Sequence, residues 1–425
     1  MKLWDVLKAR AGIPVDDTMA MLFARRKSST PVLYGYRINE SESDPELRVE
    51  YLHDAVGMTP ARMNYQTGQF DYGSWDPTKI WFLKNNRPVA LKFDGTVDYE
   101  LDPDDYTKKS DGTASDVSNA NYNGNFMASM PAVWIKRYSE TVSGTTYKYT
   151  LFSDQQLDSD FHADAHDAGD GFINDFIYFP LFKGYHSGNK LRSVSGVTPT
   201  GGTLIADTKA AAEACGSGWQ LWDWSKHELI SDLLTLISRS TNSQAAFGQG
   251  DSNTYDSSDP TTHGMLTTGT SGGGQFYGTN DETHHVKVFH IEDFWGNRFE
   301  YCLGLHLVNG YYVYKLARPY AVEPDATYTT TAYISPTNLG SPSGWQLANH
   351  SGRFGNLPQT LGGSGSTYYC DYYYGGGSVT TKTVFGGDCT TQTSNGSRYL
   401  YLRDGIASTG WDEGGSVCYS RPHSV

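Results

Sequence analysis

The chain has 425 residues, of which 19% are charged, and it contains 30 tyrosines and 46 glycines. This composition is typical of a protein rich in strands and loops, with a surface of Tyr, Ser, Thr and Gly, and the length predicts two or three domains. The formal net charge of −14 argues against nucleic acid and anionic membranes as partners, because both bind basic surfaces.

Two units are expected in the N-terminal part of the chain. Residues 1–30 contain a predicted short helix around Trp4–Lys8 and a linker, and they lack the long apolar segment of a secretory signal. From Pro31 on, short alternating segments between Gly, Pro, Asn and Asp residues predict antiparallel strands. Residues 31–124 are therefore expected to form a small β-rich module. No apolar run reaches the roughly 20 residues of a membrane span, so we expect no membrane insertion.

A larger domain is expected over residues 125–425. It contains the two strongest helix patterns of the sequence. One begins at Asp207 or Thr208, and the other opens with Ser225 and Glu228 in capping-box spacing. Leucines on one side of the second helix predict that it packs against a sheet. Because the remainder reads as strands and loops, the predicted fold class is α+β, with two helices and loop-rich antiparallel sheets.

The cysteines and histidines do not predict a metal site. Five cysteines at irregular spacing form neither a disulfide framework nor a zinc pattern. Cys370 and Cys389 are close enough in sequence to pair across a hairpin-like loop, whereas free thiols made in a reducing cytoplasm are the favoured interpretation.

Two groups of histidines have metal-ligand chemistry. They are His162 and His166 in one segment, and His284, His285 and His290 in another. In the first group Ala163 stands where the zincin pattern needs its Glu base. The second group has no carboxylate at a recognisable ligand spacing. We therefore expect surface or hydrogen-bonded core histidines, no metal ligands and no cofactor.

One carboxylate, Glu300, stands between Phe299 and Tyr301 in the apolar run "IEDFWGNRFEYCLGL". A buried charge is costly unless donors satisfy it. We therefore expect Glu300 to hold backbone amides or an arginine of the long C-terminal loops. Trp295 and Asn297, in the same run, are also expected to be structural. A catalytic role for Glu300 is the alternative.

This run, preceded by "GSGWQLWDW" and followed by a Gly-rich C-terminus, resembles the C-type-lectin-like domain of the formylglycine-generating-enzyme type. Gly296, Asn297 and Glu300 match that family's strand, while Phe299 and Tyr301 replace its tryptophans. The resemblance implies a C-type-lectin-like fold for the larger domain. The enzymes share a close pair of reactive cysteines that the scattered cysteines of this chain do not reproduce, so we expect no enzyme activity and no catalytic residues. The calcium motifs of sugar-binding C-type lectins are reduced to "EPD", so calcium-dependent sugar binding is not favoured.

Residues 362–380 have an unusual composition. Of these nineteen residues, "GGSGSTYYCDYYYGGGSVT", sixteen are Gly, Ser, Thr or Tyr. A segment so poor in aliphatic residues predicts a surface loop. Antibody binding surfaces have a similar composition, because Tyr gives large contacts at small entropy cost while Ser and Gly adapt. Flexible filler is the alternative, but exposed tyrosines without a partner promote aggregation.

The C-terminal sequence, ending in "VFGGDCTTQTSNGSRYLYLRDGIASTGWDEGGSVCYSRP", resembles the variable proteins of diversity-generating retroelements, including phage tropism determinants. In that family a reverse transcriptase mutates adenines in a C-terminal repeat, and the varied side chains lie on a binding face. The resemblance implies receptor binding, with a variable region over about 362–425.

The same resemblance implies the partners and the location. The expected receptor is a cell-surface protein or glycan of a bacterial host, and the N-terminal part would attach to other phage tail proteins. The chain would be made in the bacterial cytoplasm, would reside in the phage tail of the virion, and would form a homo-oligomer, a trimer as in the family. The alternatives are a formylglycine-generating-enzyme-like oxidase and a purely structural tail protein whose tyrosine-rich loops are buried in an oligomer.

The ligand-binding residues are expected near the C-terminus. The alternation in "SRYLYLRDG" places Tyr399, Tyr401 and Arg403 on one face while the intervening leucines enter the core. Trp411 lies beside Asp412 on a Gly-rich turn, and a core position for Trp411 is the alternative. The complete predicted set is Tyr372, Tyr373, Tyr374, Asp388, Thr390, Thr391, Thr393, Asn395, Tyr399, Tyr401, Arg403, Asp404, Ser408, Trp411, Asp412 and Tyr419.

Overall fold

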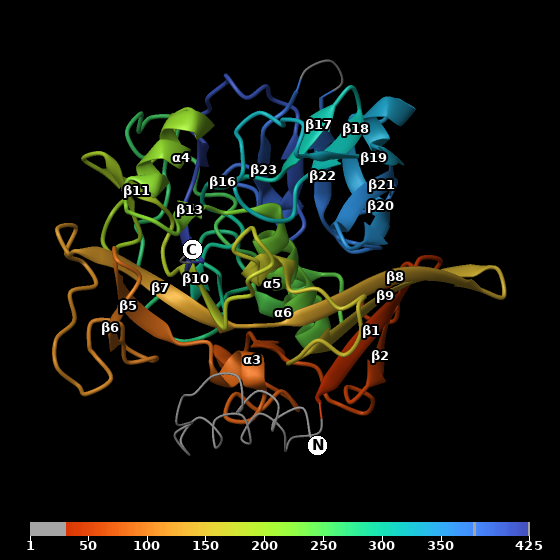
Figure 1. Ribbon diagram of the computed structural model, residues 1–425, viewed down its shortest axis with the longest axis horizontal. Helices are drawn as coiled ribbons and strands as arrows, with labels where there is room; N and C mark the ends of the chain where they lie inside the picture. The colour runs from red at the N-terminus through yellow and green to blue at the C-terminus, as the bar shows by residue number, and fades with distance from the viewer. Residues whose placement is uncertain (1–30, 377–379, 424–425) are drawn as a thin grey trace, which may run out of the picture. The chain divides into compact units, whose positions relative to one another are not determined.

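Most of the regular structure consists of antiparallel strands. The computed structural model describes residues 31–376 and 380–423 (Figure 1), so the helix predicted around Trp4–Lys8 lies outside the described residues. Residues 33–425 form one compact unit. The predicted α+β class with loop-rich antiparallel sheets is confirmed.

Two sheets contain strands from both sides of residue 124. The first has the order β2 (Val49–His53), β1 (Leu33–Asn39), β9 (Thr145–Ser153) and β8 (Trp134–Val142). The second has the order β13 (Trp219–Leu221), β26 (Val417–Ser420), β10 (Phe176–Pro180), β7 (Gly124–Pro131), β5 (Pro88–Lys92) and β6 (Val97–Glu100). The boundary predicted between 31–124 and 125–425 therefore falls between strands of one sheet. Backbone pairing of β1 with β9 and of β5 with β7 joins the two predicted units.

A third sheet, here called the C-terminal sheet, has seven strands. Their order is β21 (Gly355–Leu361), β20 (Ser343–Gly352), β22 (Tyr372–Gly375), β24 (Leu400–Leu402), β23 (Thr383–Phe385), β16 (Phe299–Cys302) and β25 (Glu413–Gly414). The pairs β22–β24 and β16–β25 are parallel, and the other pairs are antiparallel.

The remaining strands form smaller sheets. A three-stranded sheet contains β17 (Leu305–Val308), β18 (Tyr311–Tyr314) and β19 (Thr329–Ile334). Two-stranded hairpins are formed by β3 (Arg62–Asn64) with β4 (Gln69–Asp71), β11 (Tyr185–Ser187) with β12 (Lys190–Arg192), and β14 (Lys287–Val288) with β15 (Ile291–Glu292).

The described residues contain four α-helices, two more than the sequence predicted. They are α3 (Trp81–Lys84), α4 (Ile205–Glu213), α5 (Trp224–Ser238) and α6 (Ser243–Phe247). The two additional helices, α3 and α6, have only four and five residues. Three 3-10 turns, η1 (Asp164–His166), η2 (Pro336–Leu339) and η3 (Gln392–Ser394), complete the regular structure. Within the described ranges, no helix is long and apolar enough to cross a membrane.

Both predicted helix starts are wrong by a few residues. In α5 the cap is Asp223, whose side chain accepts a hydrogen bond from the Lys226 backbone N at 3.1 Å. Ser225, the predicted cap, lies inside the helix, and its hydroxyl donates to the Leu316 carbonyl at 2.8 Å. Helix α4 begins at Ile205, so that Asp207 lies in its first turn, where a negative charge stabilises the helix dipole.

Helix α5 is buried on all sides. All fifteen of its residues are buried, although the sequence predicted one apolar face. Figure 1 shows α5 between the long strands β7–β9 and the C-terminal sheet. Sheets on both sides leave no solvent-facing side, so the polar residues of α5 need buried partners.

Candidate binding site

The two faces of the C-terminal sheet carry different side chains. On β24 the leucines Leu400 and Leu402 are 2% and 0% exposed, whereas Tyr401 is partly exposed and the following Arg403 is exposed. On β22 Tyr373 is 0% exposed, while its two neighbours are partly exposed. The face with the leucines is called the inner face, and the opposite face the outer face. This alternation is the one that the sequence predicted for β24.

The inner face is part of the core around α5. The ring of Phe385 lies opposite Leu400 in the sheet register, and its centroid lies 4.5 Å from that of His227 on α5. Tyr373 is buried on this side and has a hydroxyl 3.1 Å from the Thr337 Oγ1. The predicted ligand-binding role of Tyr373 is therefore not supported by its position, because its side chain points into the core.

An aromatic row crosses the outer face. It is called the outer row and consists of Trp345, Tyr372, Tyr399, Phe299, Tyr401 and Tyr374. Consecutive ring centroids in this order lie 5.5, 6.0, 5.3, 5.6 and 5.3 Å apart. Four members are partly exposed, while Tyr399 and Phe299 are each 5% exposed and form the base of the row. Residues of four strands thus form one continuous aromatic surface.

The sheet register explains how these rings stack. Tyr374 lies directly opposite Tyr401 in the parallel pair β22–β24, and their rings are nearly parallel, with an angle of 11°. The Arg403 guanidinium lies over the Tyr374 ring, 5.0 Å from its centroid. Neighbouring strands are close to the distance at which aromatic rings stack, so cross-strand aromatic pairs stabilise one another. The ring faces are used within the protein, and the four partly exposed members are open to solvent at their edges.

The tyrosines of the outer row keep their protons. Burial and the neighbouring Asp388 raise the pKa of Tyr399, and burial and Asp404 raise the pKa of Tyr401. Both phenols are therefore neutral over the physiological range, and each is able to donate and accept hydrogen bonds.

A buried ionic network fixes Arg398, which lies two residues before β24. The guanidinium of Arg398 contacts both carboxylate oxygens of Glu228 at 3.2 Å and also contacts Asp232. Asp232 is also bound by Arg137 of β8, with Nε 2.7 Å from Oδ2, and by the Tyr36 hydroxyl at 3.0 Å. Burial opposes ionisation of Glu228, but the Arg398 charge and its neighbours lower the pKa of Glu228 to about 2. The network ties the first sheet, α5 and the C-terminal sheet together.

Glu300 fixes the C-terminal segment from the inner side. One carboxylate oxygen accepts a hydrogen bond from the Ser416 backbone N, and the other accepts from the Ser416 hydroxyl at 2.9 Å. The Lys183 ammonium lies 3.4 Å from the same oxygen. The sequence predicted a backbone amide or an arginine, and the structure has a backbone amide and a lysine. Asn297, also predicted as structural, is buried and binds Leu266 through both its side-chain atoms, and Trp295 is 0% exposed and donates to the Gly248 carbonyl.

Asp388 and Asp412 form an acidic corner at one end of the C-terminal sheet. Burial and the nearby Asp412 raise the pKa of Asp388 to about 6. Arg298 is 4% exposed, and its guanidinium donates to the Trp411 carbonyl. The Trp411 ring is partly buried and lies 4.3 Å from His263. Trp411 is therefore neither a free surface residue nor a core residue.

The other predicted ligand residues are distributed around this sheet with one exception. Thr390 and Thr393 are exposed, Thr391 is partly exposed, and Asn395 is buried; all four lie around η3. Asp404 and Ser408 are partly exposed in the loop after β24. Tyr419 lies elsewhere, in β26 of the six-stranded sheet, 3% exposed and 5.0 Å from the Trp219 ring. The structure does not bring Tyr419 to the outer row.

Two members of the outer row were missed as binding residues. Phe299 was considered only as a neighbour of Glu300, and Trp345 was not considered. Trp345 reaches the row because β20 pairs with β22 in a register that sets Trp345 opposite Tyr372. The sequence pattern gave no direct signal for this pairing, although "GWQLA" does alternate like a strand.

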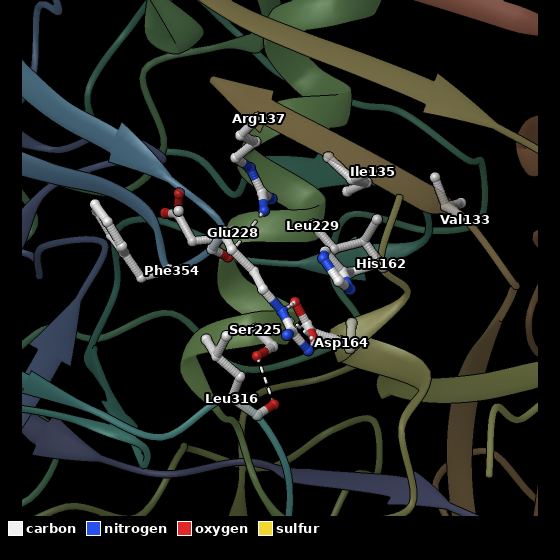
Figure 2. Close-up of a pocket in the computed structure, with 13 residues that line it drawn as sticks. Val133, Ile135, Arg137, His162, Asp164, Ser225, Glu228, Leu229, Leu316 and Phe354 are labelled. Atoms are coloured by element: carbon white, nitrogen blue, oxygen red, sulfur yellow. Dashed lines mark hydrogen bonds and ion pairs between the residues drawn. The ribbon is translucent and has the colours of Figure 1, made fainter. Parts of the chain in front are cut away.

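A pocket lined by several charged side chains is too small for a substrate. Figure 2 shows side chains of α5, β8 and residues 162–164 converging on it, including Arg137, Glu228 and Asp164. Its volume is about 20 Å³, which is close to the space of one water molecule. The Ser225 hydroxyl is already bonded to the Leu316 carbonyl, and Arg353 is paired with Asp164 at 2.7 Å.

A larger open cleft of about 510 Å³ lies beside β13. Several of its polar groups are already paired. Arg318 donates to the carbonyls of Gly218 and Ser420, the Trp219 indole donates to the Phe93 carbonyl, and Lys209 pairs with Glu213. Ligand sites usually present a few convergent polar groups that await a partner. Among the residues described, this cleft has one buried polar atom without a partner, the Nε of Arg318, and one such atom is not a convergent set.

The cysteines do not form a reactive pair. All five lie in the described part of the chain, where they are free and buried. Burial raises the pKa of each thiol, that of Cys370 to about 12. A nucleophilic cysteine needs a lowered pKa. The pairing of Cys370 with Cys389, one of the two alternatives, is not present.

Comparison with known proteins does not assign a family. No protein-family model matches the chain, and no curated protein matches it at a significant level. The outer row and the buried residues beneath it are therefore the basis for assigning a function.

Proposed function

We propose that the chain is a receptor-binding protein of a phage tail, with a C-type-lectin-like fold, and that the outer row is its binding face. One observation carries the proposal. Alternate residues of β22 and β24 divide into core residues and partly exposed aromatic residues, so a large aromatic surface stands on a fixed scaffold. Large exposed apolar surfaces in soluble proteins commonly mark interaction sites.

The residue types of this face suit binding more than catalysis. Tyrosine, tryptophan and arginine contribute most of the energy in many interfaces. The rings of Tyr374 and Tyr401 are stacked on each other and Arg403 lies over Tyr374, so little side-chain entropy is lost when a partner binds. A bacterial surface protein or glycan would meet a row of hydroxyl groups and ring edges.

The same alternation supports diversification of the C-terminal region. In a variable protein the residues that change must be separable from those that keep the fold. Tyr372, Tyr374, Tyr401 and Arg403 meet this condition, because their side chains lie outside the core. A reverse-transcriptase gene beside a near-copy of the 3′ coding region would establish the class. Differences between the two copies would then fall on codons for outer-face residues and spare those for Tyr373, Leu400 and Leu402.

Two alternative functions can be distinguished from the proposed one by experiment. An oxidase of the formylglycine-generating type is disfavoured by the raised thiol pKa values, and oxidation of a cysteine peptide by the purified chain would revive it. A purely structural tail protein would bury the outer row in an oligomer. A trimer is expected in either case, so only the effect of substitutions separates the two.

The decisive experiment removes the exposed part of the outer row. The test variant carries four alanine substitutions, at Tyr372, Tyr374, Tyr401 and Arg403. A matched control carries alanine at three tyrosines and one arginine elsewhere, namely Tyr138, Tyr147, Tyr311 and Arg421. Binding of the labelled full chain to a panel of intact bacterial cells is measured by flow cytometry, and oligomeric state by light scattering. We expect the test variant to keep its fold and oligomeric state and to lose binding, while the control retains it. Dissociation of the test variant would instead support the structural alternative.

A further inference from the structure

Three buried side chains with metal-ligand chemistry meet beside the start of β16. They are His285, Glu292 and Asp293, and one ligand atom of each lies within 4.8 Å of the others. Their exposed fractions are 4%, 2% and 1%. The sequence analysis found no carboxylate at a familiar distance from His285, because the two carboxylates lie across a hairpin.

The hairpin geometry creates this cluster. β14 and β15 pair so that Lys287 lies opposite Glu292. Adjacent residues of a strand point to opposite faces, but Asp293 has a φ of 56°. This left-handed turn ends the strand and brings the Asp293 side chain to the same side as Glu292. A positive φ outside glycine is uncommon and costs free energy, so its presence here indicates a constrained arrangement.

Neighbouring groups orient each of the three side chains. Glu292 accepts hydrogen bonds from the Gly269 backbone N at 2.8 Å and from the Ser271 hydroxyl. Asp293 Oδ2 accepts from the Asn297 amide at 2.9 Å. Such second contacts are typical of protein metal sites, where they fix the direction of each ligand.

The hydrogen bonds of His285 leave one ring nitrogen facing a carboxylate. Its Nε2 lies 3.1 Å from the Thr267 carbonyl oxygen. The same nitrogen lies 2.8 Å from the Thr270 hydroxyl, which is able to donate or accept, so these contacts allow both ring tautomers. The other nitrogen, Nδ1, lies 2.8 Å from Asp293 Oδ2. At this distance Nδ1 either donates its own proton to the carboxylate or binds a metal ion that the carboxylate also binds.

A second observation concerns Asp293 itself. Its Oδ1 is buried and has no hydrogen-bond partner among the residues described. This oxygen belongs to the carboxylate that faces His285. A buried carboxylate oxygen without a donor is expensive, and a cation in the cluster would satisfy it.

We propose that His285, Glu292 and Asp293 hold a divalent first-row transition metal ion, such as Zn²⁺ or Mn²⁺, with a structural role. One imidazole nitrogen and two carboxylates suit these ions better than calcium, which prefers oxygen ligands alone. The ion would join His285, which precedes β14, to Glu292 and Asp293 at the end of β15. The following strand, β16, carries Phe299 of the outer row. The proposal does not depend on the function of that row.

The competing arrangement is a doubly protonated His285. Burial lowers its pKa, but Asp293 and Glu292 outweigh burial and raise it to about 10. Two other buried groups face the cluster. Burial raises the pKa of Asp251 to about 7, with Asp293 adding to the effect, and burial lowers the pKa of Lys287 to about 8 against the attraction of Glu292 and Asp293. A bound metal would displace the Nδ1 proton.

Metal content of the full chain separates the two arrangements. The protein is produced in defined media supplemented with Zn²⁺, Mn²⁺ or Co²⁺, dialysed against metal-free buffer, and analysed by plasma mass spectrometry. We expect one metal ion per folded chain, and for Co²⁺ a visible absorption spectrum of a nitrogen–oxygen site. Wild-type protein that is folded by circular dichroism and carries no stoichiometric metal from any of the three media overturns the proposal in favour of the imidazolium.

Variants then assign the ligands. His285→Gln and Glu292→Gln are expected to lose the metal. His284→Gln is the matched control, because His284 is the adjacent residue but is exposed and bonded to Asp281. The control should keep full metal content. If His285→Gln folds and retains the metal, the ion lies elsewhere and the site is wrong. If the variants do not fold, the Co²⁺ spectrum of the wild type still decides the ligand class.

Discussion

The two faces of the C-terminal sheet are built from neighbouring residues of the same strands, yet their side chains differ in burial and in contacts. On the inner side, the leucines of β24, the Arg398 network and Glu300 have their apolar contacts or hydrogen-bond partners inside the protein. On the outer side, Tyr374 and Tyr401 contact each other and remain partly open to solvent. The inner face therefore holds the fold, while several side chains of the outer face remain open to solvent.

Two arginines that flank β24 provide the most direct test of this difference between the two faces. Arg398 is buried among Glu228 and Asp232, and Arg403 is exposed over Tyr374. Arg398→Ala removes the guanidinium partner of the buried Glu228 and one of the two arginines that bind the buried Asp232, so we expect the free energy of unfolding to fall by about 3–5 kcal/mol. Arg403→Ala should change it by less than about 1 kcal/mol. Urea unfolding followed by circular dichroism measures both values. Equal losses in the two variants would contradict the assignment of the faces.

Substitution of Glu300 is expected to have the next largest effect on the free energy of unfolding. Glu300→Ala removes the acceptor for the Ser416 backbone N and the partner of Lys183, so we expect a loss of about 1–3 kcal/mol for the unsatisfied donors. Glu300→Gln keeps one oxygen as an acceptor, so its free energy of unfolding should fall by a smaller amount. Thermal unfolding of the three proteins gives the order. An alanine variant that melts like the wild type would show that Glu300 does not support the C-terminal segment.

Both predictions concern features that could be predicted in part from the sequence. The alternation of Tyr and Leu around residue 400 predicted the two sides of β24, because strand periodicity is a local property. The need of Glu300 for donors was predictable from chemistry alone. The identity of its cation was not, since Lys183 lies 117 positions away.

The errors have physical reasons of the same kind. Helix α5 was predicted to have one apolar face, but it lies between sheets, and the partners of its Glu228 and Asp232 come from residues 137 and 398. A boundary was predicted between residues 124 and 125, and the pairing of β5 with β7, which begins at Gly124, is a long-range feature that local composition does not predict. Trp345 joined the outer row only through strand pairing. Long-range pairing, not local preference, decided each case.

The ionic network should make the inner face sensitive to acid. The pKa of Glu228 is about 2 in the folded protein and roughly 4.3 in an unfolded chain. Because the folded value is depressed, its contribution is complete above the unfolded value and is lost as the pH falls toward the folded value. We expect the free energy of unfolding to decrease between about pH 4.5 and pH 2. Glu228→Gln should make this decrease smaller, and a wild type and variant with the same pH dependence would contradict the role of Glu228.

The smallest effect tests the outer row as a preassembled surface. If the stacked rings of Tyr374 and Tyr401 support each other, a double-mutant cycle with Tyr374→Ala and Tyr401→Ala should give a coupling free energy of about 0.5–1 kcal/mol. Each single variant should remain folded, since neither ring enters the inner core. The control cycle combines Tyr374→Ala with Tyr311→Ala, an exposed tyrosine of β18, and should give no coupling. A coupling near zero for Tyr374 and Tyr401 would mean that the rings adopt their stacked positions independently. In that case the outer row would have to be organised by its partner, and binding would carry a larger entropy loss than a preassembled face requires.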